Sequence, residues 1–290
     1  MAAPVEKLRS LLEGPEFLAM PCCFDGLSAR LIERAGFRLT FMSGFGVAAA
    51  RFAQPDTGLI SYGEMVDQGR DICSAVSIPV IGDADTGYGN PLNVKRTVSG
   101  YARAGFAGVM IEDQVAPKRC GHTRGKDVVS REEACARVRA AVEARDQGSD
   151  IAIMARTDAR AGLGLDEALD RARVFAEIGA DILFVEAPTS EDEMERVCAE
   201  VPGHHMANMV EGGVTPILPP ERLAQLGYKI AAYPITLLSA AARAMNDALV
   251  AIGGGDPPPR LLGFSELCEA VGFDRYDEEL ARLQPREQSD

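Results

Sequence analysis

Short apolar runs of strand length recur along the chain, and amphipathic stretches of helical period separate them. In the stretch 165–178, acids and arginines occupy one face and the apolar residues share the other: Leu165, Ala168, Leu169, Ala172, Phe175 and Ala176. Such alternation is typical of parallel βα units. Eight runs follow this pattern: FLAMPCCFD, RLTFMSGFG, PVIGDADTG, GVMIEDQ, IAIMARTDA, DILFVEAP, HHMANMVEGG and KIAAYPIT.

Several predicted helices end in the same way, with a glycine followed by an apolar residue that opens the next strand. These ends are Ala35-Gly36-Phe37, Ala104-Gly105-Phe106, Ile178-Gly179-Ala180 and Leu226-Gly227-Tyr228. Glycine suits the left-handed backbone position that stops a helix. Eight such units predict an α/β fold of the closed (β/α)8 TIM barrel type more than an open doubly wound sheet. No G-x-G-x-x-G follows the first strand, which disfavours a dinucleotide-binding fold.

The sequence predicts two parts, a barrel catalytic domain over residues 1–250 and a helical tail over residues 251–290. Three consecutive prolines at 257–259 form a stiff connector, and the helical stretch FSELCEAVGFDRYDEELARL follows them. Two interpretations of the tail stay open at this point. It reaches across to another subunit, or it packs on its own barrel.

Composition and charge exclude several classes of partner. Hydrophobic residues make up 47% of the 290 residues and charged residues 25%, which is ordinary for a soluble globular protein. The formal net charge of −13 argues against a nucleic acid or an anionic membrane as partner. No run resembles a signal-peptide core or a membrane span, and the seven scattered cysteines lack a C-x-x-C spacing. We therefore expect a cytoplasmic protein that acts on a small molecule.

Polar residues stand at the carboxyl end of every apolar run, which is where barrel enzymes build their active sites. Some of them are expected to be helix caps or to form salt bridges at the rim, and Asp25 is an expected cap. In chain order they are Asp25, Ser43 with Gly44, Asp83 and Asp85, Glu112 and Asp113, Arg156 and Asp158, Glu186, Asn208 with Glu211, and Tyr233 with Thr236.

The stretch GDADTGYGN is the strongest candidate for a metal site. Two aspartates two residues apart in a strand point to the same side, so Asp83 and Asp85 can face one ion. Two negative charges at so short a distance are unfavourable unless a cation or a proton lies between them. Hard oxygen ligands favour Mg²⁺ or Mn²⁺ over zinc, and Glu112 could serve as a third ligand or hold a metal-bound water.

Two further features leave alternatives open. Arg156, in MARTDA, could clamp a substrate carboxylate or could pair with Glu186 across the barrel mouth, and a metal site two strands away favours the clamp. The stretch EDQVAPKRCGHTR, residues 112–124, could be a metal site, a reactive thiol or an ordinary surface loop.

Several motifs together resemble those of the isocitrate lyase and phosphoenolpyruvate mutase superfamily: DADTGYGN, IEDQ followed by PKRCGH, ARTDA and ANMVEGGVTP. The resemblance covers residues 5 to 250, and KRCGH points to the branch that cleaves carbon–carbon bonds. It implies a magnesium-dependent, retro-aldol-type cleavage of a 2-hydroxy di- or tricarboxylate. It also implies a homotetramer in which the last helix of the barrel is exchanged between subunits.

The resemblance also implies roles for individual residues. Asp85 would contact the metal, with Asp83 and Glu112 around its water shell. Cys120 would be the catalytic acid, with Gly121 and His122 beside it. Ser43, Gly44 and Phe45 would hold the 2-oxo acid part of the substrate, helped by Arg156. Glu186 and Asn208 would line the site, and Asp56 would lie near its mouth.

The chemistry of this cleavage agrees with a reactive thiol in KRCGH. Breaking the C2–C3 bond leaves a carboxylate with enolate character, which must be protonated on carbon, and a thiol can donate that proton. The neighbouring Lys118, Arg119, His122 and Arg124 would lower the pKa of the thiol and attract a second carboxylate. We therefore predict a reactive thiol at Cys120 and not a metal site. No residue is evident as the base that removes the hydroxyl proton.

Two positions favour a small substrate within the superfamily. Phe45 stands where bacterial 2-methylisocitrate lyases have a glycine, and Ser239 stands where they carry an arginine, with Arg243 one helical turn later. We expect a 2-methylmalate or 2,3-dimethylmalate type of substrate, cleaved to a 2-oxo acid such as pyruvate and a monocarboxylate. The alternatives are 2-methylisocitrate cleavage, oxaloacetate hydrolysis or decarboxylation, phosphonopyruvate chemistry, and binding of a metal-chelating anion without turnover.

Overall fold

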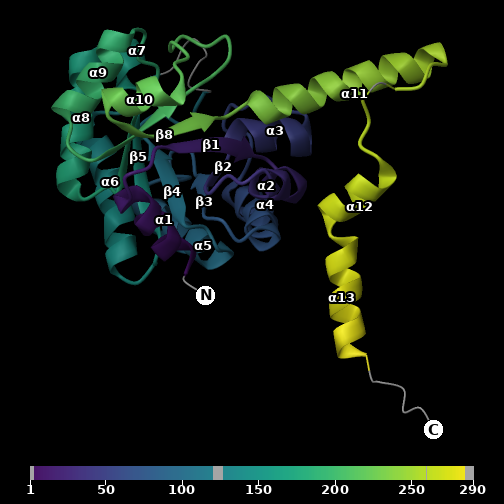
Figure 1. Ribbon diagram of the computed structural model, residues 1–290. Helices are drawn as coiled ribbons and strands as arrows, with labels where there is room; N and C mark the ends of the chain where they lie inside the picture. Colours follow the sequence, from purple (N-terminus) through teal and green to yellow (C-terminus); the bar gives the residue numbers. More distant parts are fainter. Residues whose placement is uncertain (1–2, 120–126, 259, 285–290) are drawn as a thin grey trace. The chain divides into compact units, whose positions relative to one another are not determined.

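The computed structural model describes residues 3–119, 127–258 and 260–284 (Figure 1). The chain divides into two compact units, residues 1–239 and residues 240–290. The expected domain boundary after residue 250 falls inside a helix, α11 (Thr236–Gly254), and it stays a prediction. Cys120, Gly121, His122 and Arg124 lie outside the described residues.

The first unit is built on a closed barrel of eight strands, in which each strand runs parallel to its neighbours and β8 pairs with β1 (Figure 1). The predicted (β/α)8 barrel is therefore confirmed. The exchange of a helix between subunits stays a prediction. The strands are β1 (Leu18–Cys23), β2 (Thr40–Met42), β3 (Val80–Asp83), β4 (Gly108–Glu112), β5 (Ala152–Thr157), β6 (Ile182–Val185), β7 (His204–Asn208) and β8 (Tyr228–Tyr233).

Helices connect the strands. Those of the first unit, besides the start of α11, are α1 (Pro4–Glu13), α2 (Gly26–Arg34), α3 (Gly44–Phe52), α4 (Tyr62–Ala75), α5 (Pro91–Ala104), α6 (Arg131–Asp146), α7 (Ala159–Leu163), α8 (Leu165–Ile178), α9 (Glu191–Glu200) and α10 (Pro220–Leu226). The second unit contains the rest of α11, α12 (Phe264–Val271) and α13 (Phe273–Leu283). No helix in the described ranges is both long and apolar enough to cross a membrane.

Helix ends follow the sequence closely. Asp25 caps α2, because its Oδ1 accepts a hydrogen bond from the Ser28 amide at 2.7 Å, as predicted. Gly105, Gly179 and Gly227 each adopt a left-handed conformation where α5, α8 and α10 stop. A side chain at that backbone conformation is disfavoured by sterics, so glycine sets where each helix turns into the next strand.

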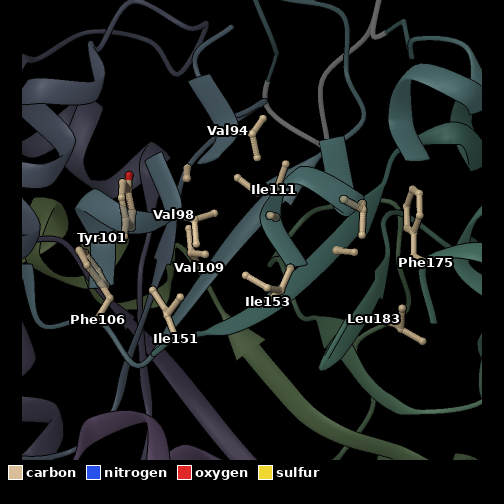
Figure 2. Close-up of a cluster of buried hydrophobic side chains, with 14 of the residues drawn as sticks. Val94, Val98, Tyr101, Phe106, Val109, Ile111, Ile151, Ile153, Phe175 and Leu183 are labelled. Carbon is tan, nitrogen blue, oxygen red and sulfur yellow. The ribbon is translucent and has the colours of Figure 1, made fainter. Parts of the chain in front are cut away.

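Apolar side chains fill two regions around the strands. Outward-facing residues such as Val109, Ile111 and Ile153 pack in one core with the surrounding helices (Figure 2). Met110, between Val109 and Ile111, belongs to a second core. That second core includes residues of α1, among them Leu8, which approaches Gly108 at the start of β4. Successive residues of a strand therefore point alternately into the core between strands and helices and into the core inside the barrel. Helix α1 covers the end of the barrel opposite the carboxyl ends of the strands.

Replacing Gly82 by alanine is expected to destabilise the barrel. A Cβ at Gly82 would lie 2.6 Å from the Phe106 ring and 2.7 Å from the Tyr101 ring, and these rings stack with centroids 4.7 Å apart. Overpacking of this kind costs about 1–3 kcal/mol of unfolding free energy, which urea denaturation would measure. Gly162→Ala is the matched control, since a Cβ there meets nothing within 4 Å. Equal stability of the two variants would contradict the prediction.

Candidate active site

A pocket of about 240 Å³ lies at the carboxyl ends of the barrel strands. The structure brings most of the predicted site residues to it: Ser43, Phe45, Asp56, Asp83, Arg156, Glu186 and Asn208 line its wall. Gly44 lies beside the wall and donates its amide hydrogen to Asp83 Oδ2 at 3.2 Å. Residues from distant parts of the chain meet here because parallel strands end at one face of the barrel.

The pocket also has an apolar lining, of which only Phe45 was expected from the sequence. Part of it comes from strand positions that face the barrel interior, namely Cys22, Phe41, Met110, Phe184, Met206 and Ala232. The signal for these residues is present in the sequence, since they alternate with the outward-facing residues of the same strands. Phe45, Val210, Pro234 and Ile235 add apolar surface nearer the loops.

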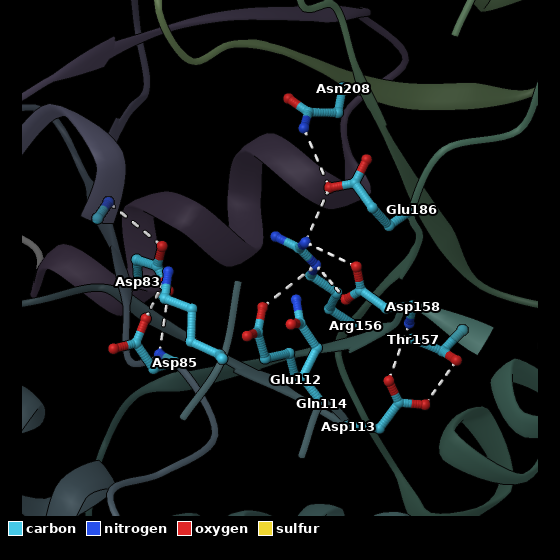
Figure 3. Close-up of polar contacts among 12 residues, drawn as sticks. Asp83, Asp85, Glu112, Asp113, Gln114, Arg156, Thr157, Asp158, Glu186 and Asn208 are labelled. Carbon is cyan, nitrogen blue, oxygen red and sulfur yellow. Dashed lines mark hydrogen bonds and ion pairs between the residues drawn. The ribbon is translucent and has the colours of Figure 1, made fainter. Parts of the chain in front are cut away.

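Asp83 and Asp85 do not form the strand pair that the sequence predicted. β3 ends at Asp83, and Asp85 has a positive φ of 48°, so the two-residue spacing is not that of an extended strand. The Asp85 amide donates to Asp83 Oδ1 at 3.0 Å, which makes a tight turn. The expectation that both lie on one strand is wrong, yet the turn still keeps their carboxylates close (Figure 3).

Lys118 neutralises this acidic group. Its ammonium lies 2.9 Å from Asp85 Oδ1 and 2.6 Å from Asp56 Oδ1, and its side chain is 5% exposed. Burial alone would lower the pKa of Lys118, but the effect of Asp85, Asp83 and Asp56 dominates and raises it well above its ordinary value. The lysine therefore stays charged. The sequence placed Lys118 near the thiol, but it gave no sign of these two ion pairs.

Two carboxylates of this region, Asp85 and Glu112, are destabilised as anions. Burial raises the pKa of Asp85 to about 6, with Lys118 opposing the shift and Asp83 and Asp56 adding to it. Burial likewise raises the pKa of Glu112 well above its ordinary value, although Arg156 opposes it. Within the described part of the chain, Glu112 Oε1 is buried without a hydrogen-bond partner. A cation at this position would stabilise these groups.

The donor chemistry here fits a hard divalent ion. Mg²⁺ is commonly bound by one or two carboxylates, with waters and substrate oxygens completing its shell. Asp85 and Asp83 provide such a pair, and Glu112 provides a further oxygen. No group of three or more potential ligands (His, Cys, Asp or Glu) is gathered closely enough to form a complete metal site among the described residues. Asp83, Asp85 and Glu112 are therefore not a complete ligand set by themselves among the described residues.

Arg156 is surrounded by three carboxylates. Its Nε and Nη2 donate to Asp158 at 2.8 and 3.0 Å, Nη2 lies 3.1 Å from Glu186 Oε2, and Nε lies 3.4 Å from Glu112 Oε2. The pairing with Glu186, one of the two predicted alternatives, is therefore present. Its guanidinium also lies over the Phe184 ring, 5.1 Å from the centroid. The sequence already places Asp158 together with Arg156 at the carboxyl end of the fifth apolar run.

The remaining predicted residues have definite places. Asn208 donates to Glu186 Oε2 at 3.2 Å, so these two residues and Arg156 form one connected group (Figure 3). In the eighth unit, Arg243 pairs with Asp247 on α11 within the second compact unit. The Ser239 amide donates to the Ile235 carbonyl at 2.8 Å.

Replacing Arg156 by methionine is expected to destabilise the fold as well as the site. Asp158, Glu112 and Glu186 have side chains at most 1% exposed, and they would lose the cation that balances them. Breaking a buried ion pair costs about 3–5 kcal/mol, which thermal or urea unfolding would detect. Arg9→Met is the control, because its partner Asp150 is exposed and such pairs contribute about 0–1 kcal/mol. Similar losses in both variants would contradict this account.

The closed barrel carries, at the carboxyl ends of its strands, a pocket with an acidic turn and a buried arginine. The sequence profile of the phosphoenolpyruvate phosphomutase family matches residues 8–253. The chain therefore belongs to the phosphoenolpyruvate mutase/isocitrate lyase superfamily. It is an enzyme, and the expectation of a lyase of this superfamily is confirmed.

Two curated relatives are similar over nearly their whole length. The 2,3-dimethylmalate lyase of Eubacterium barkeri is 43% identical over 276 residues, which cover 94% of this chain and 95% of the relative. A probable 2-methylisocitrate lyase of Corynebacterium glutamicum is 41% identical, with 95% of this chain and 91% of the relative covered.

Solved structures agree with this assignment. An oxaloacetate acetylhydrolase in complex with the inhibitor 3,3-difluorooxalacetate superposes with a TM-score of 0.94 at 34% identity, covering 98% of each chain. A phosphonopyruvate hydrolase in complex with oxalate and Mg²⁺ superposes with a TM-score of 0.85 at 30% identity, covering 97% of this chain and 99% of that one. The superfamily thus includes a protein whose structure holds Mg²⁺.

Proposed function

We propose that this enzyme cleaves the C2–C3 bond of a 2-hydroxy dicarboxylate of the 2-methylmalate or 2,3-dimethylmalate type. The products would be a 2-oxo acid such as pyruvate and a short monocarboxylate. The observation that carries the proposal is that Asp83, which lies beside Asp85, and Arg156 line the same pocket. An acidic pair for a metal and a buried cation for a carboxylate are what a chelating 2-hydroxy acid requires.

In this proposal different residues bind the metal ion and the substrate carboxylate. Asp85, with Asp83 and Glu112 around it, would hold Mg²⁺ or Mn²⁺, and the bound ion supplies Lewis-acid stabilisation of charge on the C2 oxygen. Arg156 binds the substrate carboxylate. Its contacts to Asp158 and Glu186 hold the guanidinium in one orientation before substrate arrives, which lowers the entropy cost of binding.

Other residues of the pocket complete the substrate site. Ser43, Gly44 and Phe45 are proposed to hold the 2-oxo acid part, with Asp56, Glu186 and Asn208 around it. The Ser43 hydroxyl already accepts the Gly46 amide hydrogen at 3.1 Å, so its orientation is fixed by the start of α3. A fixed hydroxyl at the pocket wall supports a role in orienting the substrate.

Cys120 is proposed to donate a proton to C3 of the carboxylate fragment that forms when the C2–C3 bond breaks. Gly121 and His122 would lie beside it. These three residues lie outside the described part of the chain, so the proposal rests on the KRCGH motif and on the chemistry. The two preceding residues, Lys118 and Arg119, line the pocket. Cations at the pocket wall would attract a second carboxylate and lower the pKa of the thiol, which makes it a stronger proton donor.

The apolar residues near the loops favour a small, methylated diacid. Phe45, Val210, Pro234 and Ile235 line the pocket and offer no charge to a third carboxylate. A carboxylate buried without a cationic partner costs several kcal/mol or more. The likeness to oxaloacetate acetylhydrolase makes hydrolysis of oxaloacetate the second candidate. The cytoplasmic location and the homotetramer with exchanged C-terminal helices also remain proposals.

A panel of acids tests the proposed function. We expect 2-methylmalate or 2,3-dimethylmalate, with Mg²⁺, to release a 2-oxo acid with a kcat/KM at least about tenfold above 2-methylisocitrate, isocitrate or oxaloacetate. A tenfold ratio corresponds to about 1.4 kcal/mol of transition-state binding. Preference for 2-methylisocitrate would overturn the choice of substrate. Turnover of phosphonopyruvate that survives loss of Cys120, or oxalate binding without any turnover, would overturn the proposed C2–C3 cleavage.

A further inference from the structure

Arg156 is oriented by a carboxylate that is itself held from outside the barrel. Asp158 accepts from Nε and Nη2 of Arg156, a two-point contact that fixes both the position and the plane of the guanidinium. Asp158 is 1% exposed and follows directly after β5. The direction of the guanidinium therefore depends on where the backbone places Asp158.

Asp113, the residue after β4, contacts the backbone at that point. Its Oδ1 accepts from the Asp158 amide at 2.8 Å, and its Oδ2 accepts from the Thr157 hydroxyl at 2.6 Å (Figure 3). Glu112 and Arg156 are partners across β4 and β5. The residue that follows each of them along the chain points to the opposite face, so Asp113 and Thr157 meet behind the pocket wall.

Arg171 of α8 completes this arrangement. Its Nη1 donates to Asp113 Oδ2 at 3.0 Å, and its Nε donates to Glu167 Oε1 at 2.8 Å. Arg171 and Asp113 are each 2% exposed. A continuous line of contacts therefore runs from the outer helix layer through Asp113 and Asp158 to the guanidinium of Arg156.

We propose that Asp113, together with Thr157 and Arg171, is a positioning residue that sets the geometry with which Arg156 binds a carboxylate. The proposal rests on the proposed function of Arg156 in substrate binding. Asp113 is not among the described residues that line the pocket, so it acts through Asp158. A role in stability alone would leave carboxylate affinity unchanged, whereas a role in positioning changes that affinity.

Two substitutions test the proposal with oxalate and Mg²⁺ as the probe in calorimetric titrations. Thr157→Val keeps the shape of the side chain but removes the hydroxyl that Asp113 accepts from. Arg171→Met leaves Asp113 without its cation. We expect the Kd for oxalate to rise about tenfold in Thr157→Val and about 10- to 100-fold in Arg171→Met, by analogy with residues that orient the ligands of a metal ion. Thr157→Ser retains the hydroxyl and should restore the affinity.

Matched controls separate positioning from general destabilisation. Arg173→Met makes the same change on the same helix, where Arg173 pairs with Asp170 and Glu200 at the surface. Leu8→Ala creates a cavity at the opposite end of the barrel and should lower Tm. We expect both controls to bind oxalate as the wild type does. In cleavage assays of Thr157→Val, KM should rise by a larger factor than kcat falls.

Each outcome of these titrations decides a different point. Wild-type affinity for oxalate in Thr157→Val would overturn the positioning role even if Arg171→Met fails to fold. Equal weakening in Leu8→Ala and Thr157→Val would also overturn it. Failure of the wild-type enzyme itself to bind oxalate with Mg²⁺ would overturn the proposed substrate site and this inference together. Weakening in Thr157→Val that Thr157→Ser reverses would support the positioning role.

Discussion

Replacing Asp85 by alanine is expected to abolish cleavage at ordinary concentrations of Mg²⁺ or Mn²⁺, a loss of about 10³-fold or more in kcat/KM if the ion supplies several kcal/mol of charge stabilisation. The carboxylate lies at the turn after β3, beside Asp83. Removing it takes away the proposed metal contact. Cleavage should stop in excess chelator, and magnesium or manganese should restore it in the wild-type enzyme only.

A binding measurement separates loss of the metal from loss of the fold. Burial raises the pKa of Asp85 to about 6, so the charged carboxylate is destabilised in the folded protein that lacks an ion. Lys118 retains Asp56 as a partner after the substitution. Asp85→Ala should therefore keep the Tm of the metal-free protein while its Mn²⁺ affinity, measured by electron paramagnetic resonance, is lost. Asp67→Ala, at an exposed pair with Arg51, is the control. Full turnover in excess chelator would exclude the metal role.

The barrel could be predicted from the sequence because its evidence is periodic. Eight apolar runs, each followed by an amphipathic stretch and several by a helix-ending glycine, repeat one local rule. The closed order of strands agrees with that repeat. The location of the pocket followed as well, because parallel strands bring their carboxyl ends to one face. Ser43, Asp83, Arg156, Glu186 and Asn208 were all found by that reasoning.

The local geometry of the site could not be predicted in the same way. The period of a strand says nothing of where the strand stops, so Asp85 was placed on β3 although it lies in a turn with positive φ. The ion pairs of Lys118 depend on a loop contacting two distant segments, and no spacing rule encodes such contacts. Arg171 reaches Asp113 from α8, where the amphipathic pattern indicates only an arginine on the polar face.

Replacing Cys120 by alanine or serine is expected to lower kcat by about 10²-fold or more while leaving the affinity for oxalate nearly unchanged. Oxalate resembles the planar 2-oxo acid part and needs no proton, so its binding reports on the metal, Arg156 and the other residues that hold that part, and not on the proton transfer. The enolate-like fragment must take up a proton on carbon before it can be released as the monocarboxylate product. Rapid quench of a single turnover, with the 2-oxo acid followed over time, measures the step directly.

The other cysteines provide the controls for this experiment. Burial raises the pKa of Cys198 to about 12, and the same cause raises that of Cys73 to about 12. These thiols stay protonated at neutral pH and should react slowly with iodoacetamide, so Cys198→Ala should leave both cleavage and inactivation by the reagent unchanged. Cys120→Ala should make the remaining activity insensitive to it. Near-normal cleavage by Cys120→Ala would remove the thiol from the chemistry and favour hydrolysis or decarboxylation, in which Arg156 and the metal act without a proton donor at residue 120.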